Sequence, residues 1–276
     1  CYSRLGQYPE AVSRLLRQLE EHPEEREYAQ RALQLAGSAQ EKLELWTEAQ
    51  ASYRRLLELE PAPQLRAEAW FRLGSVQLAV RDYPAALASF TRVLVDHPDA
   101  AQAGEALFYA AESLYFAGRY AEAQRRFQLA LESLGRGTAS AEQQRETCLY
   151  RLARIQARLQ RPSEALVSLE ALQRGYPRGR YAAEIPLLRA EALFELKRYG
   201  EALAEYRRAL ASAATPADRQ KISYNLALAA LGAGRPEEAL EPLAAAAQGG
   251  DAQIAERSLF RLASALADLN LSLIHI

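Results

Sequence analysis

The chain has 276 residues, of which 49 % are hydrophobic and 25 % are charged, with a net charge of −1 at pH 7. This balance is typical of a soluble globular protein and excludes extensive disorder, and a dedicated nucleic-acid binder would be more basic. The longest apolar stretches, such as residues 244–247, are too short to span a bilayer, so we expect neither a nucleic-acid partner nor direct membrane insertion.

Both ends of the chain carry signs of truncation. The sequence contains no methionine, so we expect the natural start to lie upstream, and any signal peptide with it. Cys1 could instead be a processed lipoprotein cysteine. Residues 271–276 resemble a translated sequencing-library adapter, and we expect them not to be native. The alternative is a genuine apolar tail.

One ten-residue line, here called the repeat line, recurs along the chain. The fourth copy reads GRYAEAQRRF and occupies residues 118–127. The alanine in the middle of each copy marks the period, and the seven positions are Ala11, Ala49, Ala86, Ala123, Ala165, Ala202 and Ala239. Successive alanines lie 38, 37, 37, 42, 37 and 37 residues apart, and residues 135–140 supply the longer step. A fixed period of about 20–50 residues predicts a repeat architecture in which neighbouring units stack.

Each period contains two amphipathic helical patterns, helix A before the repeat line and helix B after its turn. Apolar residues recur at helical spacing on both sides of the turn at residues 82–84, namely Ala69, Leu73, Val76 and Val80, then Ala86, Phe90, Val93 and Leu94. Each period therefore predicts a helical hairpin.

The residues of the repeat line fit the turn between two helices. Gly118 and Gly234 can adopt the left-handed conformation that ends helix A. Prolines suit the first turn of helix B, as at Pro84, Pro162 and Pro236. The recurring alanine allows the two helices to cross closely. Prolines also end several B helices, at His22-Pro23, Glu60-Pro61, His97-Pro98 and Tyr176-Pro177.

This pattern resembles the tetratricopeptide repeat family over nearly all of residues 1–270. The fullest match to the family's spacing is formed by Trp70, Leu73, Gly74, Ala86, Phe90 and Pro98. The resemblance implies an all-α fold, a right-handed superhelical solenoid of antiparallel helix pairs with about six full repeats and partial repeats at both ends. It implies a single domain over residues 1–270. Pro186 departs from the pattern, so we expect its helix A to start late or to kink.

The 37-residue period and the His-Pro and Tyr-Pro endings resemble the bacterial cell-envelope branch of the family. Relatives in that branch include the Tol-Pal accessory protein and the outer-membrane assembly lipoprotein. This resemblance favours a periplasmic or outer-membrane setting, with the cytoplasm as the alternative.

The family resemblance also implies a binding groove lined by the A helices. The expected groove residues are Phe71, Phe108, Glu112, Tyr115, Tyr150, Leu187, Glu191, Phe194 and Tyr224. An aromatic stripe with isolated carboxylates suits an extended or helical peptide, because rings bring contact area at low entropic cost. The alternative is that these rings pack adjacent A helices together.

Motifs for catalysis, cofactors or metals are absent from the sequence. It contains no phosphate-binding loop ending in Lys-Ser or Lys-Thr, no His-Glu-x-x-His and no Cys-x-x-Cys. Cys148 lies among apolar residues and is expected to be a buried, inert thiol. We therefore predict a non-catalytic scaffold, without cofactors or metals, that binds a peptide or protein partner and acts in envelope assembly. The alternative is a regulatory or targeting arm of a larger enzyme or transcriptional regulator.

Overall fold

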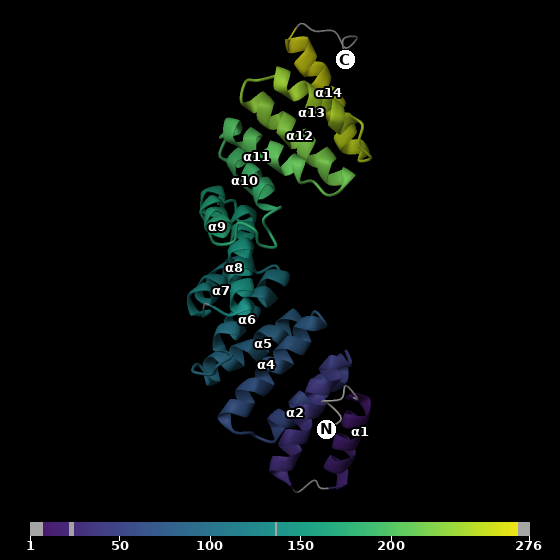
Figure 1. The fold of residues 1–276 in the computed structure, drawn as a ribbon, viewed down its shortest axis with the longest axis vertical. Coiled ribbons are helices and arrows are strands. Elements are labelled where there is room, and N and C mark those ends of the chain that lie inside the picture. Colours follow the sequence, from purple (N-terminus) through teal and green to yellow (C-terminus); the bar gives the residue numbers. More distant parts are fainter. Residues whose placement is uncertain (1–7, 22–24, 136, 270–276) are drawn as a thin grey trace. The chain divides into compact units, whose positions relative to one another are not determined.

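The computed structural model describes residues 8–21, 25–135 and 137–269. Cys1, His22-Pro23 and the adapter-like residues 271–276 lie outside these ranges. All regular secondary structure in the described residues is α-helical, in fourteen helices that follow one another in pairs (Figure 1). The predicted all-α fold of helical hairpins is confirmed.

The helices fall into two units, residues 1–148 and residues 149–276. Unit 1 contains seven complete helices, α1 (Tyr8–Glu21), α2 (Arg26–Lys42), α3 (Trp46–Glu58), α4 (Pro63–Ala79), α5 (Tyr83–Asp96), α6 (Ala103–Phe116) and α7 (Tyr120–Ser133). The division between the units falls within α8 (Ala139–Arg158). Unit 2 contains α9 (Pro162–Gly175), α10 (Ile185–Glu195), α11 (Tyr199–Ala211), α12 (Pro216–Gly232), α13 (Glu237–Ala247) and α14 (Ala252–Asp268). The single domain over residues 1–270 stays a prediction.

The turn from helix A to helix B has a residue with positive φ at the same position of each described turn. Gly118 and Gly234 have φ values of 77° and 71°, which confirms the predicted left-handed turns. At the equivalent positions of the other four described turns the chain has non-glycine residues with φ between 58° and 63°, namely Glu44, Arg81, Gln160 and Lys197. In the turn at Gly118, the Arg119 amide donates to the Leu114 carbonyl at 2.9 Å, and the Gly118 amide donates to the Tyr115 carbonyl at 3.0 Å. These bonds satisfy carbonyls that the end of α6 would leave without partners.

The recurring alanines lie where the paired helices cross. Each one in the described helices is at most 1 % exposed, namely Ala49, Ala86, Ala123, Ala165, Ala202 and Ala239. The aromatic residue four positions later in several copies is also buried, as at Tyr53, Phe90, Phe127 and Tyr206. The helix A residues that face the rings of Tyr53 and Phe90 are the glycines Gly37 and Gly74. Such small residues allow the two helices to approach closely.

Helix α10 starts late, as Pro186 predicts. It has 11 residues, begins at Ile185, and carries Pro186 in its first turn. Proline lacks a backbone N–H and fits only the start of a helix without breaking hydrogen bonds. The residues that precede α10 therefore form turns, and they bring Tyr181 against the core of unit 2.

Candidate functional site

Three of the expected groove residues lie in the interior of unit 1. Phe71, Phe108 and Tyr115 are 9 %, 6 % and 8 % exposed. The Phe71 ring meets Phe90 edge-to-face with centroids 5.7 Å apart, and the Phe108 ring meets Phe127 at 6.2 Å. These rings pack helices together, which is the alternative that the sequence left open for them.

Tyr150 is also buried, in unit 2. Its ring is stacked on Tyr181 with centroids 3.8 Å apart and an interplanar angle of 5°. Its hydroxyl donates a hydrogen bond to the Glu184 carboxylate and accepts one from Arg154 Nη1 at 3.1 Å. Burial, together with the bond to Glu184, raises the pKa of Tyr150 to about 12. Tyr150 is thus satisfied within the protein.

The other expected groove residues keep contact with solvent. Glu112, Leu187, Phe194 and Tyr224 are partly exposed, and Glu191 is exposed. Three of them, Glu191, Phe194 and Tyr224, line two cavities in unit 2. The structure therefore does not form one continuous open stripe from the nine residues, and the binding role of those nine residues stays a prediction.

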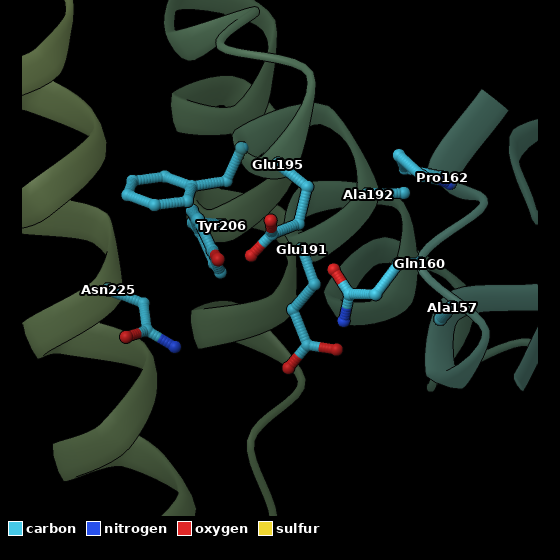
Figure 2. Close-up of a pocket in the computed structure, with 9 residues that line it drawn as sticks. Ala157, Gln160, Pro162, Glu191, Ala192, Glu195, Tyr206 and Asn225 are labelled. Atoms are coloured by element: carbon cyan, nitrogen blue, oxygen red, sulfur yellow. The ribbon is translucent and has the colours of Figure 1, made fainter.

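The first cavity, here called the acidic cavity, has a volume of about 350 Å³. Its polar lining comes from four elements, with Gln160 in the turn before α9, Glu191 and Glu195 on α10, Tyr206 on α11, and Asn225 on α12. In Figure 2 the carboxylates of Glu191 and Glu195 lie between Asn225 on one side and Gln160 on the other, and the Tyr206 hydroxyl points toward them. The ring of Phe194 adds an apolar wall.

Helix geometry explains why two carboxylates meet in the acidic cavity. Glu191 and Glu195 are four residues apart on α10, so they lie one turn apart on the same face. No Lys, Arg or His lines the described cavity. The carboxyl of Glu191 is open to water but crowded by protein atoms, and this partial desolvation raises its pKa above the ordinary value, against the opposing effect of Arg154.

Tyr206 closes the floor of the acidic cavity. The residue is 2 % exposed, and its hydroxyl has no hydrogen-bond partner among the described residues. Burial raises its pKa above the ordinary value, and the nearby charges of Glu191 and Glu195 raise it further. The hydroxyl therefore remains protonated at neutral pH and can either donate or accept a hydrogen bond.

The second cavity lies between α12 and α14 and has a volume of about 650 Å³. It is lined by Tyr224, Gln253, Glu256, Arg257, Phe260 and Arg261. Phe260 is 73 % exposed, the largest exposed fraction among the large apolar side chains of the described residues. Because Tyr224 and Asn225 are neighbours on α12, the two cavities adjoin the same stretch of that helix.

Sequence reasoning missed several lining residues of these cavities. Glu195 lies one helical turn after Glu191, so it could have been found by extending the expected face of α10. Asn225 directly follows Tyr224 and is therefore rotated by about 100° from the expected face of α12. Gln160 carried no such signal, because its position depends on the left-handed turn that it occupies. Phe260 belongs to α14, for which no groove residue was expected.

The described residues offer little for other kinds of site. No group of three or more His, Cys, Asp or Glu residues in the described part of the chain is arranged to hold a metal ion. Cys148 is buried, and burial raises the pKa of its thiol to about 12. Of the helices that the structure describes, none is both long and apolar enough to cross a membrane.

Comparison with known protein families yields one match. A family model described as the tetratricopeptide repeat matches residues 34–101, 71–143, 150–219 and 187–254. These overlapping matches cover residues 34–143 and 150–254, which is well over half of the chain. Among curated proteins, none matches the sequence.

Several solved structures resemble the chain at low sequence identity. The C-terminal part of a TPR repeat-containing protein from Cytophaga hutchinsonii has a TM-score of 0.68 and 11 % identity, covering 95 % of this chain and 96 % of its own. YrrB, described as a TPR protein with an unusual peptide-binding site, has a TM-score of 0.60 and 20 % identity, covering 75 % and 97 %. The pilF protein of Pseudomonas aeruginosa has a TM-score of 0.53 and 16 % identity, covering 88 % and 99 %. At such identities the likeness shows the fold alone.

Proposed function

The chain belongs to the tetratricopeptide repeat family, and from that premise we propose that it is a non-catalytic scaffold that holds an extended peptide segment of a partner protein along α10, α12 and α14. Proteins of this family generally mediate protein–protein interactions. The description of YrrB as having a peptide-binding site supports a peptide as the partner. A solenoid of helix pairs suits this role because its alternate helices form an extended surface.

The observation that carries the proposal is the pair of cavities in unit 2 that border the same stretch of α12. Alternate helices α10, α12 and α14 line them, and each helix contributes an accessible ring, Phe194, Tyr224 or Phe260. Accessible rings beside polar groups are typical of interaction surfaces, because each ring buries a large area when a partner binds. The volumes of about 350 and 650 Å³ accommodate individual side chains of a peptide.

A binding experiment on the full chain tests this proposal. Random dodecamer peptides displayed on phage would be selected against the protein, and enriched peptides would be synthesised and measured by fluorescence anisotropy. We expect Phe260→Ala to weaken peptide binding about tenfold, as for a residue in the centre of an interface. Because Phe260 is 73 % exposed, the substitution should leave stability unchanged.

Val167 on α9 provides a matched control. It is 69 % exposed and lies outside both cavities, so Val167→Ala removes a similarly exposed apolar side chain. We expect this control to bind the selected peptides as the parent does. Failure to enrich any peptide, or equal losses for the two variants, would overturn the proposal.

The envelope setting is a further part of this proposal. Its support is the resemblance of the 37-residue period and of the His-Pro and Tyr-Pro endings, such as His97-Pro98 and Tyr176-Pro177, to the envelope branch. The complete reading frame tests it, since an upstream secretion signal would support an envelope role and an upstream catalytic or DNA-binding domain would contradict it. The alternative of a regulatory arm has no supporting observation in the described residues.

A further inference from the structure

The two carboxylates of the acidic cavity differ from several others in unit 2. Those others have arginine partners. Glu201 pairs with Arg198 at 2.7 Å, and Glu238 pairs with Arg207 at 2.7 Å. Arginine is the basic partner in both of these ion pairs, and it makes up most of the basic residues of this chain.

No described arginine forms an ion pair with the carboxylates of the acidic cavity, although Arg154 is close enough to favour the ionised form of Glu191. Glu191 and Glu195 form no ion pair or hydrogen bond with any described residue, and the side-chain amides of Gln160 and Asn225 form no hydrogen bonds there either. The carboxylate and amide oxygens thus share one space of about 350 Å³, and no described residue donates a hydrogen bond to either carboxylate. A cation that enters this space would be attracted by both carboxylates, which lie one helical turn apart.

The hydroxyl of Tyr206 is a second and independent observation. Tyr206 is 98 % buried and lines the cavity, and its hydroxyl has no hydrogen-bond partner among the described residues. The hydroxyl oxygen itself is open to water in the cavity, so a ligand that displaces this water can form a hydrogen bond with it. The position of this hydroxyl therefore fits a site in which the ligand supplies its hydrogen-bond partner.

We propose that the acidic cavity binds the cationic side chain of an arginine or lysine residue in the peptide partner. The inference rests on the proposed function and specifies its ligand. The carboxylates of Glu191 and Glu195 would accept charged hydrogen bonds, and the Phe194 ring offers a face to the cation. An anionic group is excluded by the two carboxylates, and an apolar side chain would leave five polar side chains without partners.

Arginine fits the cavity better than lysine. A guanidinium group has five donors in one plane, whereas an ammonium group has three. The acceptors of the acidic cavity come from four separate elements, so a planar group with several donors can reach more of them at once. We therefore expect the affinity for an arginine side chain to exceed that for lysine.

The first experiment uses small probes and the isotopically labelled full chain. N-acetyl-arginine N-methylamide would be titrated into the protein while the side-chain amide signals of Gln160 and Asn225 are followed by NMR. We expect saturable shifts of both signals. The matched probe is N-acetyl-citrulline N-methylamide, which has nearly the same shape but no charge and should leave the signals unchanged. Equal shifts with both probes, or none with the arginine probe, would overturn the inference.

The second experiment uses variants that keep the shape of the cavity. The double substitution Glu191→Gln and Glu195→Gln removes both charges, and we expect it to weaken arginine-probe binding at least about tenfold. Glu170→Gln is the control, because Glu170 is an exposed carboxylate on α9 that pairs with Arg174 outside the cavity. It should change the dissociation constant less than about twofold. A double variant that binds like the control would contradict the assignment.

The substitution Tyr206→Phe tests the hydroxyl separately. Because it deletes one oxygen that lacks a protein partner, the variant should fold and melt at about the same temperature as the parent. It should bind the arginine probe about two- to tenfold more weakly, as for the loss of one hydrogen bond. Unchanged binding by Tyr206→Phe would remove the hydroxyl from the site and overturn its part in the inference.

Failure of this inference can be told apart from failure of the proposed function. If selected peptides bind the protein and replacement of their arginines and lysines by citrulline and norleucine has no effect, the cation site is wrong and the scaffold stands. If the arginine probe binds the acidic cavity but no peptide is enriched, the cation site is supported and the peptide scaffold is overturned.

Discussion

The ring of Tyr53 on α3 lies so close to Gly37 on α2 that a Cβ atom added to Gly37 would come within 2.7 Å of the ring's Cζ atom. The next repeat has the same relationship, with a Cβ on Gly74 reaching 2.9 Å from the Phe90 ring. Both rings are almost completely buried. In these two repeats, the glycine on helix A therefore leaves the space that the aromatic ring of helix B fills at the helix crossing.

We predict that Gly37→Ala destabilises the protein. The added methyl would force the Tyr53 ring or the two helices apart, at a cost of about 1–3 kcal/mol, as is usual for overpacking a core. Chemical denaturation would measure the change in the free energy of unfolding. The control is Gly175→Ala at the end of α9, where an added Cβ meets nothing within 4 Å. If the free energy of unfolding fell no more than in this control, the helix crossing would have space for the added methyl group.

The left-handed turn at Gly118 gives a second prediction, of a different physical origin. An added Cβ there meets no atom within 4 Å, so the cost of Gly118→Ala comes from the backbone φ of 77° alone. We expect a loss of about 1–2 kcal/mol, the cost of placing an alanine in this conformation. Gly200→Ala on α11 is the matched control, because that site also has open space but no positive φ. Thermal unfolding that is equal for the two variants would contradict the turn argument.

Tyr150 should behave as a core residue. Because its ring is 4 % exposed and stacked on Tyr181, Tyr150→Ala should cost about 3–5 kcal/mol, the range for large aromatic truncations. Equilibrium unfolding in urea would provide this number. A cost below about 1 kcal/mol would instead favour an open ring and restore Tyr150 to the expected groove.

Cys148 should be unreactive in the folded protein. Burial raises the pKa of its thiol to about 12, so the reactive thiolate is nearly absent at pH 8. In a Cys1→Ser background, which leaves one cysteine, a thiol-specific chromogenic reagent should label no thiol in the native protein and one in guanidinium chloride. Rapid stoichiometric labelling of the native protein would disprove the burial of Cys148.

Glu191 provides a prediction about pH. Its pKa is raised in the folded protein by desolvation, so the ionised carboxylate opposes folding above that pKa, and the penalty disappears as the pH falls through it. We therefore expect Glu191→Gln to be slightly more stable than the parent at pH 7, by about 0.5 kcal/mol or less, since the side chain is partly solvated. The difference should shrink toward pH 4. Melting curves of both proteins over this range measure it, and a difference that grows with acidity would reverse the sign of the argument.

The architecture of this protein could be predicted from local patterns alone. The structure confirms the predictions made from the alanines Ala86 and Ala123, from Gly118, and from Pro186 as the mark of a late helix start. Each of these residues acts within one helix or one turn. Such features depend on helical spacing and backbone conformation, which neighbouring residues in the chain decide. The left-handed turns at Arg81 and Lys197 were not predicted, because non-glycine residues seldom adopt them and the sequence carries no marker.

The candidate site depended instead on how the helices stack. The sequence by itself determined that Phe108 and Tyr150 occupy the same place on their A helices and that Phe194 lies two turns further along its own, and it could not separate the buried rings from the accessible one. The burial of each ring depends on the side chains that neighbouring segments place against it. Phe127 packs against Phe108 and Tyr181 packs against Tyr150, whereas Phe194 borders a cavity. The meeting of Glu191 with Asn225 likewise arises only when α10 and α12 line one cavity, because contacts between residues distant in the chain are a property of the tertiary structure.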